Sequence, residues 1–373
     1  MKQRILTLLL VLCLALTGCT SMLERDYLLI SPHEPISAGG GNPSALRVES
    51  YQELVNAVIY LVSEGDEHGV LGLYNYTRNV EDDLTRACLE VVQEDPLGAY
   101  AVDYIKYDST LIVSYYEANI YITYRRTQEQ VASIVSVTGS SAIRRELSKT
   151  LTSFSPEAVL RVSYFAEDED YILDLVRQAY YDTPEAALGM PEVEVSIYPS
   201  SGRQRIVEIL LTYQENPEVL RRRSQTLKDM ALLQALPGTT AGQLYTFVEK
   251  DLTVEEGTGL SSAYDALIEG TADSEGAALA YQLLCGQAGI DCTVVWGELE
   301  GEPHFWNIVA VDGGEYRHVD LSAGLQNLTD VELTETGTYE WDRGEYPACG
   351  DPAPEPSPEI PDEEEPPDDT EQT

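Results

Sequence analysis

The order of hydrophobic and polar positions predicts two kinds of element that alternate through the first part of the chain. ELVNAVIYLVSE and YILDLVRQAYY carry apolar residues at spacings of three and four, which is typical of amphipathic helices. NIYITY and EVEVSIYP alternate between apolar and polar residues, which is typical of strands with one buried face. The pattern therefore predicts sheets with helices packed on one face.

This pattern occurs twice, each time as helix, strand, helix, strand, strand. Pro96 matches Pro184 at an offset of 88, and Tyr124 matches Tyr213 at an offset of 89. One residue of slippage over such a span is what a duplicated domain shows. The sequence predicts two duplicated small α/β sandwich modules. Neither contains a His–carboxylate pair or a glycine-rich phosphate loop, so a spacer or interaction role is expected.

The N-terminus predicts where the protein is held. Lys2 and Arg4 precede ILTLLLVLCLALTG, an apolar stretch shorter than the roughly 20 residues of a membrane-spanning helix. It ends in LTGC, at Cys19, which resembles the lipobox of bacterial lipoproteins. That resemblance implies cleavage before Cys19 and lipid attachment to its sulfur, so acyl chains would hold the protein at the extracytoplasmic face of the cell membrane. The alternative is an ordinary secretory signal with an incidental cysteine.

The formal net charge of −41 excludes nucleic-acid binding as a main role, because such a surface repels phosphates. Part of the charge lies in the last stretch, DPAPEPSPEIPDEEEPPDDTEQT, which has ten acidic residues and no Lys or Arg. This composition predicts a disordered, Pro-rich tail, either an interaction segment or a solvated spacer. In chain order, the predicted segments are a lipoprotein signal peptide, a flexible tether, the two modules, a third domain with its helical connection, and the tail: residues 1–18, 19–45, 46–136, 137–225, 226–350 and 351–373.

Besides Cys19, four cysteines would remain after cleavage, and they show no CxxC spacing: Cys88, Cys285, Cys292 and Cys349. A zinc site is therefore not expected, and nothing in the sequence indicates another metal or a cofactor. Four cysteines allow three complete disulfide pairings, and the sequence does not choose among them.

The third domain contains SSAYDALIEGTADSEGAALAYQLLCGQAGIDCTVVWG, followed by EPHFWNIVAVDGGEYRHVDLS. In spacing and order these blocks resemble the transglutaminase-like superfamily, which has a papain-like thiol fold. The resemblance implies an α+β domain and places the family's nucleophile at Ser274, its base at His304 and its orienting acid at Asp320. The family has Cys at the first of these positions.

The last two positions lie on two predicted strands, HFWNIVAV and EYRHVDLS, joined around Gly313 and Gly314. A three-residue loop would place Asp320 opposite Trp306, and therefore diagonal to His304 on the same face of the sheet. A carboxylate there could hold the imidazole in one tautomer. The alternative for His304 is a packed or exposed strand histidine.

Ser274 is the departure that matters most for function. A helix N-terminus and a neighbouring His lower the pKa of a thiol, but a serine hydroxyl is too weak an acid to ionise there. Asp273 or Ser274 also fits a helix N-cap, a structural role. Ala277 departs from the family again, because an aromatic residue is usual at that position, and LSAG after Asp320 is a third departure. Cys285 and Cys292 look like buried hydrophobic residues and poor thiolates.

The expected function is a non-enzymatic surface lipoprotein whose third domain binds peptide or an envelope polymer without cleaving it. The expected wall of its cleft is Trp306 with Tyr264 and Tyr281, although these aromatic residues fit the core as well. One alternative is an active hydrolase or acyl transferase with a serine nucleophile. Another is a purely structural envelope protein.

Overall fold

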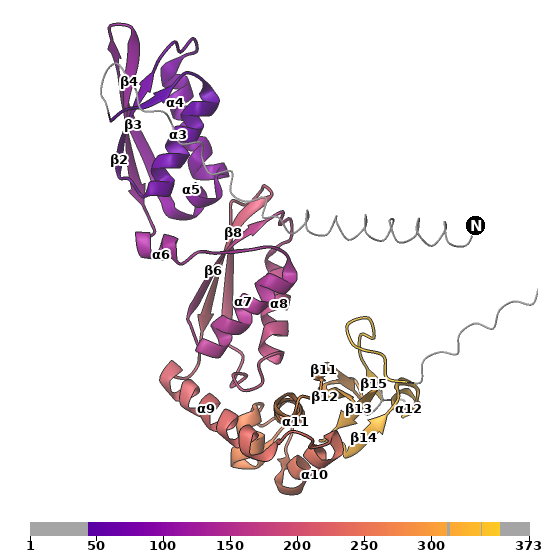
Figure 1. Cartoon of the computed structure of the whole chain (residues 1–373). Helices are drawn as coiled ribbons and strands as arrows, with labels where there is room; N and C mark the ends of the chain where they lie inside the picture. Colours follow the sequence, from indigo (N-terminus) through magenta and orange to yellow (C-terminus); the bar gives the residue numbers. More distant parts are fainter. Residues whose placement is uncertain (1–43, 312–313, 337, 351–373) are drawn as a thin grey trace, which may run out of the picture. The chain divides into compact units, whose positions relative to one another are not determined.

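The computed structural model describes residues 44–350 except 312, 313 and 337 (Figure 1). The predicted signal peptide, Cys19, nearly all of the tether and the acidic tail lie outside the described residues. Among the described residues, no helix is both long and apolar enough to cross a membrane. The described residues divide into two compact units: the first lies within 44–150, 155–176 and 192–212, and the second within 151–154, 177–191 and 213–350. The predicted segment boundaries remain predictions.

The first unit contains a four-stranded sheet with the strand order β1-β2-β4-β3. The strands β1 and β2 are parallel and the other neighbours are antiparallel. The two longest strands, β3 and β4, form an antiparallel hairpin, and more buried and more exposed side chains alternate along both. The strand bounds are Leu46–Val48 for β1, His68–Leu73 for β2, Val102–Ile112 for β3 and Tyr115–Tyr124 for β4.

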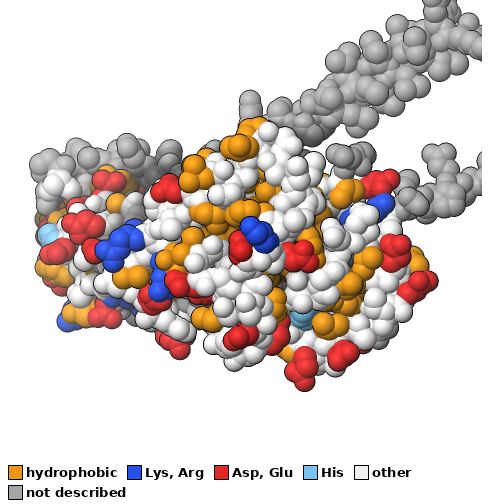
Figure 2. Space-filling view, turned by 90° about the horizontal axis from the view of Figure 1, so that it is seen from below, with side chains coloured by type: hydrophobic (Ala, Val, Ile, Leu, Met, Phe, Trp, Pro, Cys, Tyr) orange, Lys and Arg blue, Asp and Glu red, His pale blue; other side chains and the backbone are white. Residues whose placement is uncertain are grey.

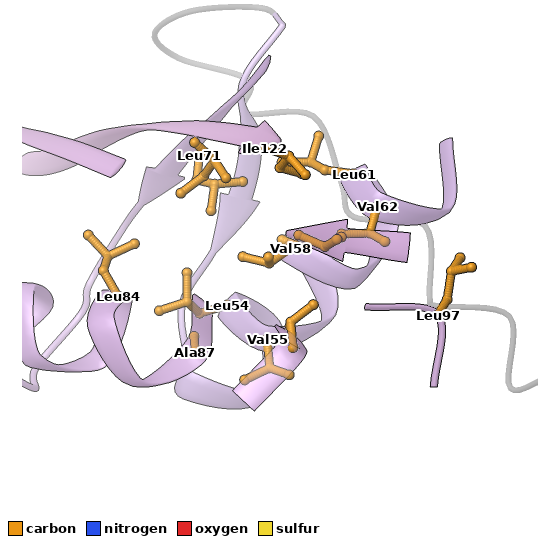
Figure 3. Close-up of a cluster of buried hydrophobic side chains, with 14 of the residues drawn as sticks. Leu54, Val55, Val58, Leu61, Val62, Leu71, Leu84, Ala87, Leu97 and Ile122 are labelled. Atoms are coloured by element: carbon orange, nitrogen blue, oxygen red, sulfur yellow. The ribbon is translucent and has the colours of Figure 1, made fainter. Parts of the chain in front are cut away.

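Helices α3 (Tyr51–Glu64) and α4 (Val80–Glu94) pack against this sheet and form its core (Figure 3). Their apolar residues recur every three or four positions, so one stripe of each helix is buried. Leu54 and Leu84 are completely buried in this cluster together with Leu71 of β2. Short helices follow at Pro96–Ala101 (α5) and Gln128–Ala132 (α6).

A second four-stranded sheet in the first unit has the order β5-β6-β8-β7, again with one parallel pair followed by antiparallel pairs. Each sheet begins with a three-residue strand that the sequence pattern did not predict, because three residues are too few to show alternation. Helices α7 and α8 lie along this sheet (Figure 1). The bounds are Val135–Val137 (β5), Ser140–Ser153 (α7), Glu157–Ser163 (β6), Glu169–Tyr181 (α8), Glu192–Tyr198 (β7) and Gln204–Thr212 (β8).

The second unit begins with helices and ends with an antiparallel sheet, so the mixed α and β composition is confirmed. Its sheet has the order β14-β13-β12-β11-β15. The helical part consists of α9 (Pro217–Gln234), α10 (Ala241–Asp251), a π-helical turn (Asp265–Glu269), α11 (Ser274–Ala288) and two-residue strands at Thr253–Val254 (β9) and Thr271–Ala272 (β10). The sheet part consists of β11 (Cys292–Leu299), β12 (Glu302–Ala310), β13 (Tyr316–Asp320), β14 (Leu325–Leu328), α12 (Asp330–Glu335) and β15 (Tyr339–Glu340).

The two faces of this sheet pack against different partners. Asn307 Nδ2 donates to the backbone oxygen of Ala278 in α11 at 3.0 Å, so α11 covers the face of β12 that carries Asn307. Side chains alternate along a strand, and the opposite face therefore carries His304 and Trp306. On that opposite face Trp306 joins a buried cluster with Leu333 of α12 and Tyr339 of β15.

Candidate active site

Ser274 is the first residue of α11, and its side chain is buried. Asp273 is the N-cap, and its carboxylate accepts from the Gly276 backbone N–H at 3.0 Å. The capping role that the sequence predicts at 273 or 274 therefore belongs to Asp273. This leaves the Ser274 hydroxyl available for other contacts.

Position 276 has no room for a side chain, which explains the glycine there. A Cβ atom at that position would lie 2.8 Å from the Ala272 Cβ and 2.9 Å and 3.0 Å from the backbone oxygens of Ser262 and Leu260. The close approach anchors the first turn of α11 against the preceding loop, and this fixes the position of Ser274.

His304 and Asp320 meet as the sequence predicts. Asn307 pairs with Val319 between β12 and β13, and this register places Asp320 opposite Trp306, diagonal to His304. The Nε2 atom of His304 lies 2.7 Å from Oδ2 of Asp320, and both residues are buried. A buried carboxylate at this distance fixes the imidazole's orientation and tautomer.

Asp320 accepts three further hydrogen bonds. The Tyr339 hydroxyl donates to Oδ2 at 2.7 Å, and the Ser322 hydroxyl and the Ala323 N–H donate to Oδ1 at 2.6 Å and 3.0 Å. Burial on its own would raise the pKa of Asp320, but hydrogen bonds from His304, Ser322 and Tyr339 outweigh it and lower that pKa. Asp320 is therefore ionised at neutral pH. Burial, and then the charge of Asp320, raises the pKa of the Tyr339 hydroxyl, which stays protonated as the donor.

Ser274 contacts a different carboxylate. Its backbone N–H donates to Oε1 of Glu256 at 3.0 Å, and its hydroxyl donates to Oε2 at 3.4 Å. Glu256 is exposed on the loop that follows β9. In the part of the chain that the structure describes, no hydrogen bond joins Ser274 to His304, and Nδ1 of His304 has no hydrogen-bond partner.

A second carboxyl group lies beside the site on α11. Burial, together with the charge of Asp273, raises the pKa of Glu275 to about 7, although the hydrogen bond from Tyr181 opposes the shift. That bond joins the Tyr181 hydroxyl to Oε1 of Glu275 at 3.2 Å. The Tyr181 ring also contacts Trp296 and Phe305, with ring centroids 6.2 Å and 5.8 Å away. The Glu275 carboxyl group therefore loses its proton near neutral pH, next to aromatic side chains.

The aromatic residues expected to form a cleft wall are mostly core residues. Trp306 and Tyr281 are each 1% exposed, so neither side chain lines an open surface. The Tyr281 hydroxyl donates to the Ala241 backbone oxygen at 3.1 Å. Tyr264 is half-buried, and the Arg223 guanidinium lies 5.2 Å from its ring centroid. Trp306 and Tyr281 therefore fit the alternative, in which they belong to the core.

His318, Asp330 and Cys349 bring three metal-ligand types within 4.8 Å of one another. The Trp306 indole N–H donates to Nδ1 of His318 at 3.0 Å, so the ring proton sits on Nε2 and donates to Asp330 at 2.9 Å. Nε2 then has no lone pair for a cation. Burial also lowers the pKa of His318 and raises that of Cys349 to about 12, which favours a neutral imidazole and a protonated thiol. The chemistry of this trio fits a hydrogen-bonded group rather than a metal site.

Sequence reasoning missed Glu256, Ser322 and Tyr339. Ser322 lies two residues after Asp320. An Asx-type turn, in which the Asp320 carboxylate accepts from the Ala323 N–H, could have suggested that Ser322 lies near that carboxylate. Glu256 and Tyr339 are 18 and 19 residues from their partners, and no periodicity connects them.

No family model and no curated protein matches the chain. Among solved structures, the chain is similar to a proposed cysteine protease from Cytophaga hutchinsonii, with 13% identity, a TM-score of 0.23, and coverage of 40% of this chain and 70% of that one. It is also similar to a TGase, with 12% identity, a TM-score of 0.27, and coverage of 58% and 65%. A proposed protease from Parabacteroides distasonis gives 9% identity, a TM-score of 0.22, and coverage of 58% and 51%.

Proposed function

We propose that the protein is a membrane-anchored extracytoplasmic lipoprotein whose transglutaminase-like domain binds peptide or an envelope polymer and does not cleave it. The observation that carries the proposal is the contact of Glu256 with both the backbone N–H and the hydroxyl of Ser274.

A serine nucleophile needs a neutral base that accepts its proton and backbone N–H groups that stabilise the developing oxyanion. At Ser274 the hydroxyl donates toward the Glu256 carboxylate, and His304 is not its hydrogen-bond partner. The N–H that would stabilise an oxyanion donates to the same carboxylate. A carboxylate there repels negative charge on a substrate oxygen, so the groups that bind a transition state are occupied by an anion.

Anchoring through lipid on Cys19 and duplication of the two modules complete the proposal. The modules act as spacers between the membrane and the third domain, and the identical strand order of the two sheets supports their duplication. In Figure 2, Asp and Glu side chains are scattered over the face shown, with Lys and Arg between them. The described residues on that face form no continuous basic patch.

An active Ser274–His304–Asp320 hydrolase or acyl transferase is the second candidate. It is favoured by the 2.7 Å contact between His304 Nε2 and Asp320, which leaves Nδ1 without a partner among the described residues. In this candidate Glu256 moves away when substrate binds.

The reactivity of a thiol placed at position 274 tests the proposal. In Ser274→Cys the Glu256 carboxylate would oppose thiolate formation, so we expect slow alkylation by iodoacetamide near neutral pH. Adding Glu256→Gln removes that charge and should speed alkylation by about tenfold, since a nearby unit charge shifts a pKa by about one unit. The parent protein, which has a hydroxyl at 274, provides the background rate of the native cysteines. Fast alkylation of Ser274→Cys alone, with a depressed thiol pKa, would support the enzyme.

A further inference from the structure

A cavity of about 500 Å³ lies at the far end of α11 from Ser274. Its walls come from the segment after α8, from α9, from the last turns of α11 and from the start of β11, all of them in the second unit. Helix α11 rises about 1.5 Å per residue, so Ser274 and Gly286, which lines the cavity, are about 18 Å apart. The cavity is therefore separate from the candidate active site, and its size is typical of sites that bind small molecules.

The walls of the cavity are largely apolar. Leu232 is 55% exposed although it lines the cavity, so hydrocarbon surface extends to the mouth. Gly286 also lines the cavity and is exposed, and a Cβ atom there would meet nothing within 4 Å. The apolar lining residues are Pro184, Ala231, Leu232, Leu283 and Ile290. A ligand with an apolar body that enters the cavity therefore removes hydrocarbon surface from water, both its own and that of the walls.

The charged groups of the cavity leave one negative charge in excess. Lys228 and Glu185 carry opposite charges, and Lys228 Nζ lies 3.7 Å from Glu185 Oε1. The other charged residue of the lining is Asp291, whose Oδ2 accepts from the Tyr316 hydroxyl at 2.7 Å. A carboxylate has room for further donors. A cationic ligand is therefore favoured, and the net charge of −41 gives the chain as a whole a field of the same sign.

An unpaired hydrogen-bond acceptor adds a second preference. Gln282 lines the cavity, and its Oε1 atom is buried without a hydrogen-bond partner among the described residues. A buried acceptor that is left unpaired lowers stability. The last torsion of a Gln side chain is broad, so a small rotation of the amide can present this oxygen to a donor in the cavity. A ligand that carries N–H donors therefore suits both Gln282 and Asp291.

We infer that this cavity binds a small organic monocation, a protonated primary amine joined to an apolar body. The body packs against the apolar walls, the ammonium group pairs with Asp291, and Gln282 offers a further acceptor. An anion is disfavoured, because the cation of the lining, Lys228, already faces Glu185 and Asp291 would repel the ligand. Ser274 does not line the cavity, so this inference goes beyond the proposed function and does not rest on it.

Isothermal titration calorimetry on the full chain tests the inference with three probes that share one apolar body. These are 1-naphthylmethylamine, which is a cation at pH 7, the neutral 1-naphthylmethanol and the anion 1-naphthylacetate. About 0.15 M salt screens long-range attraction between the amine and the many carboxylates of the chain. We expect the amine to bind at one site with a dissociation constant of about 0.1–1 mM. The alcohol should bind about threefold more weakly, and the acetate at least about tenfold more weakly.

Two variants locate the bound amine. Gly286→Leu adds a side chain at the mouth of the cavity and should weaken binding of the amine by about tenfold or more. Gly242→Leu is its matched control, because Gly242 is an exposed glycine of α10 whose added Cβ also meets nothing within 4 Å, and it should bind like the parent protein. Asp291→Asn removes the charge and keeps an acceptor for Tyr316. It should lower the affinity for the amine to that for the alcohol and leave the alcohol unaffected.

The inference is wrong if the amine gives no saturable heat up to about 10 mM, well above the expected dissociation constant. It is also wrong if the acetate binds as tightly as the amine, or if Gly286→Leu and Asp291→Asn bind the amine as tightly as the parent protein. Far-UV circular dichroism checks that the variants are folded. If Gly286→Leu does not fold, the three probes on the parent protein and the exposed substitution Asp291→Asn still decide the matter. Reactivity at Ser274 affects none of these results, so this inference and the proposed function fail separately.

Discussion

His304 Nε2 lies 2.7 Å from Asp320 Oδ2, across two neighbouring antiparallel strands. The hydroxyls of Tyr339 and Ser322 and the Ala323 N–H also donate to that carboxylate. A fixed carboxylate therefore holds the imidazole of His304 in place. Ser274 does not contact this pair and is hydrogen-bonded to Glu256 instead.

Replacing Asp320 with Asn tests how much the contact between His304 and Asp320 contributes to the free energy of unfolding. The pKa of Asp320 is lowered in the folded protein, so its stabilisation is complete above its unfolded value of about 3.9 and is lost as the pH falls through the folded value. We expect Asp320→Asn to cost about 2 kcal/mol at pH 7 and little at pH 2. All three Trp residues lie in the second unit, so Trp fluorescence in urea reports its unfolding. Asp251→Asn, at an exposed position, is the control, and equal stability of both variants at pH 7 would contradict the prediction.

Glu275 should give the opposite pH dependence. Its pKa is raised to about 7 in the folded protein, so the second unit loses stability as the pH rises from the unfolded value of about 4.3 through 7. We expect Glu275→Gln to stabilise that unit by about 2 kcal/mol at pH 8 and to have little effect at pH 4.5. Glu269→Gln, on the exposed end of the π-helical turn, should show no such difference. A flat pH profile for Glu275→Gln relative to the parent would refute the assignment.

Two glycines of α11 form a matched pair. Gly276→Ala places a Cβ within 3.0 Å of backbone oxygens and should destabilise the second unit by about 1–3 kcal/mol. Gly286→Ala meets nothing within 4 Å and should stabilise it by about 0.5–1 kcal/mol, because alanine favours the helix. Urea unfolding of the two variants checks both signs, and a stabilising Gly276→Ala would show that the first turn of α11 is not packed as described.

The Trp306 indole donates a hydrogen bond in addition to filling space in the core. Trp306→Phe removes the donor to His318 Nδ1 and leaves a buried acceptor unpaired, which should cost about 1–3 kcal/mol. Trp341 packs edge-on against His318 with ring centroids 5.0 Å apart and is half-buried. Trp341→Phe keeps a ring at that place and should cost less than Trp306→Phe. Far-UV circular dichroism in urea compares the two, and equal losses would show that the hydrogen bond adds nothing.

The sequence predicted those parts of the site that depend on local rules. Strand alternation and a glycine-containing turn were enough to place Asp320 diagonal to His304, and helix capping was enough to place a cap at 273 or 274. The contact of Glu256 with Ser274 could not be predicted, because a loop without periodicity brings the two together. The sequence pattern also could not predict how exposed the aromatic side chains are. Trp306 and Tyr281 fitted a cleft wall and the core equally well. In the structure α12 and β15 cover Trp306, and α10 covers Tyr281.

Covalent labelling shows whether the hydroxyl at position 274 acts as a nucleophile. The full chain is incubated with a serine-directed fluorophosphonate and its intact mass is measured, with Ser274→Ala as the control. We expect no adduct on the parent protein, so that incubation leaves its mass unchanged, as it leaves the mass of Ser274→Ala unchanged. An adduct on the parent protein that is absent from Ser274→Ala would contradict this expectation and identify a working serine enzyme.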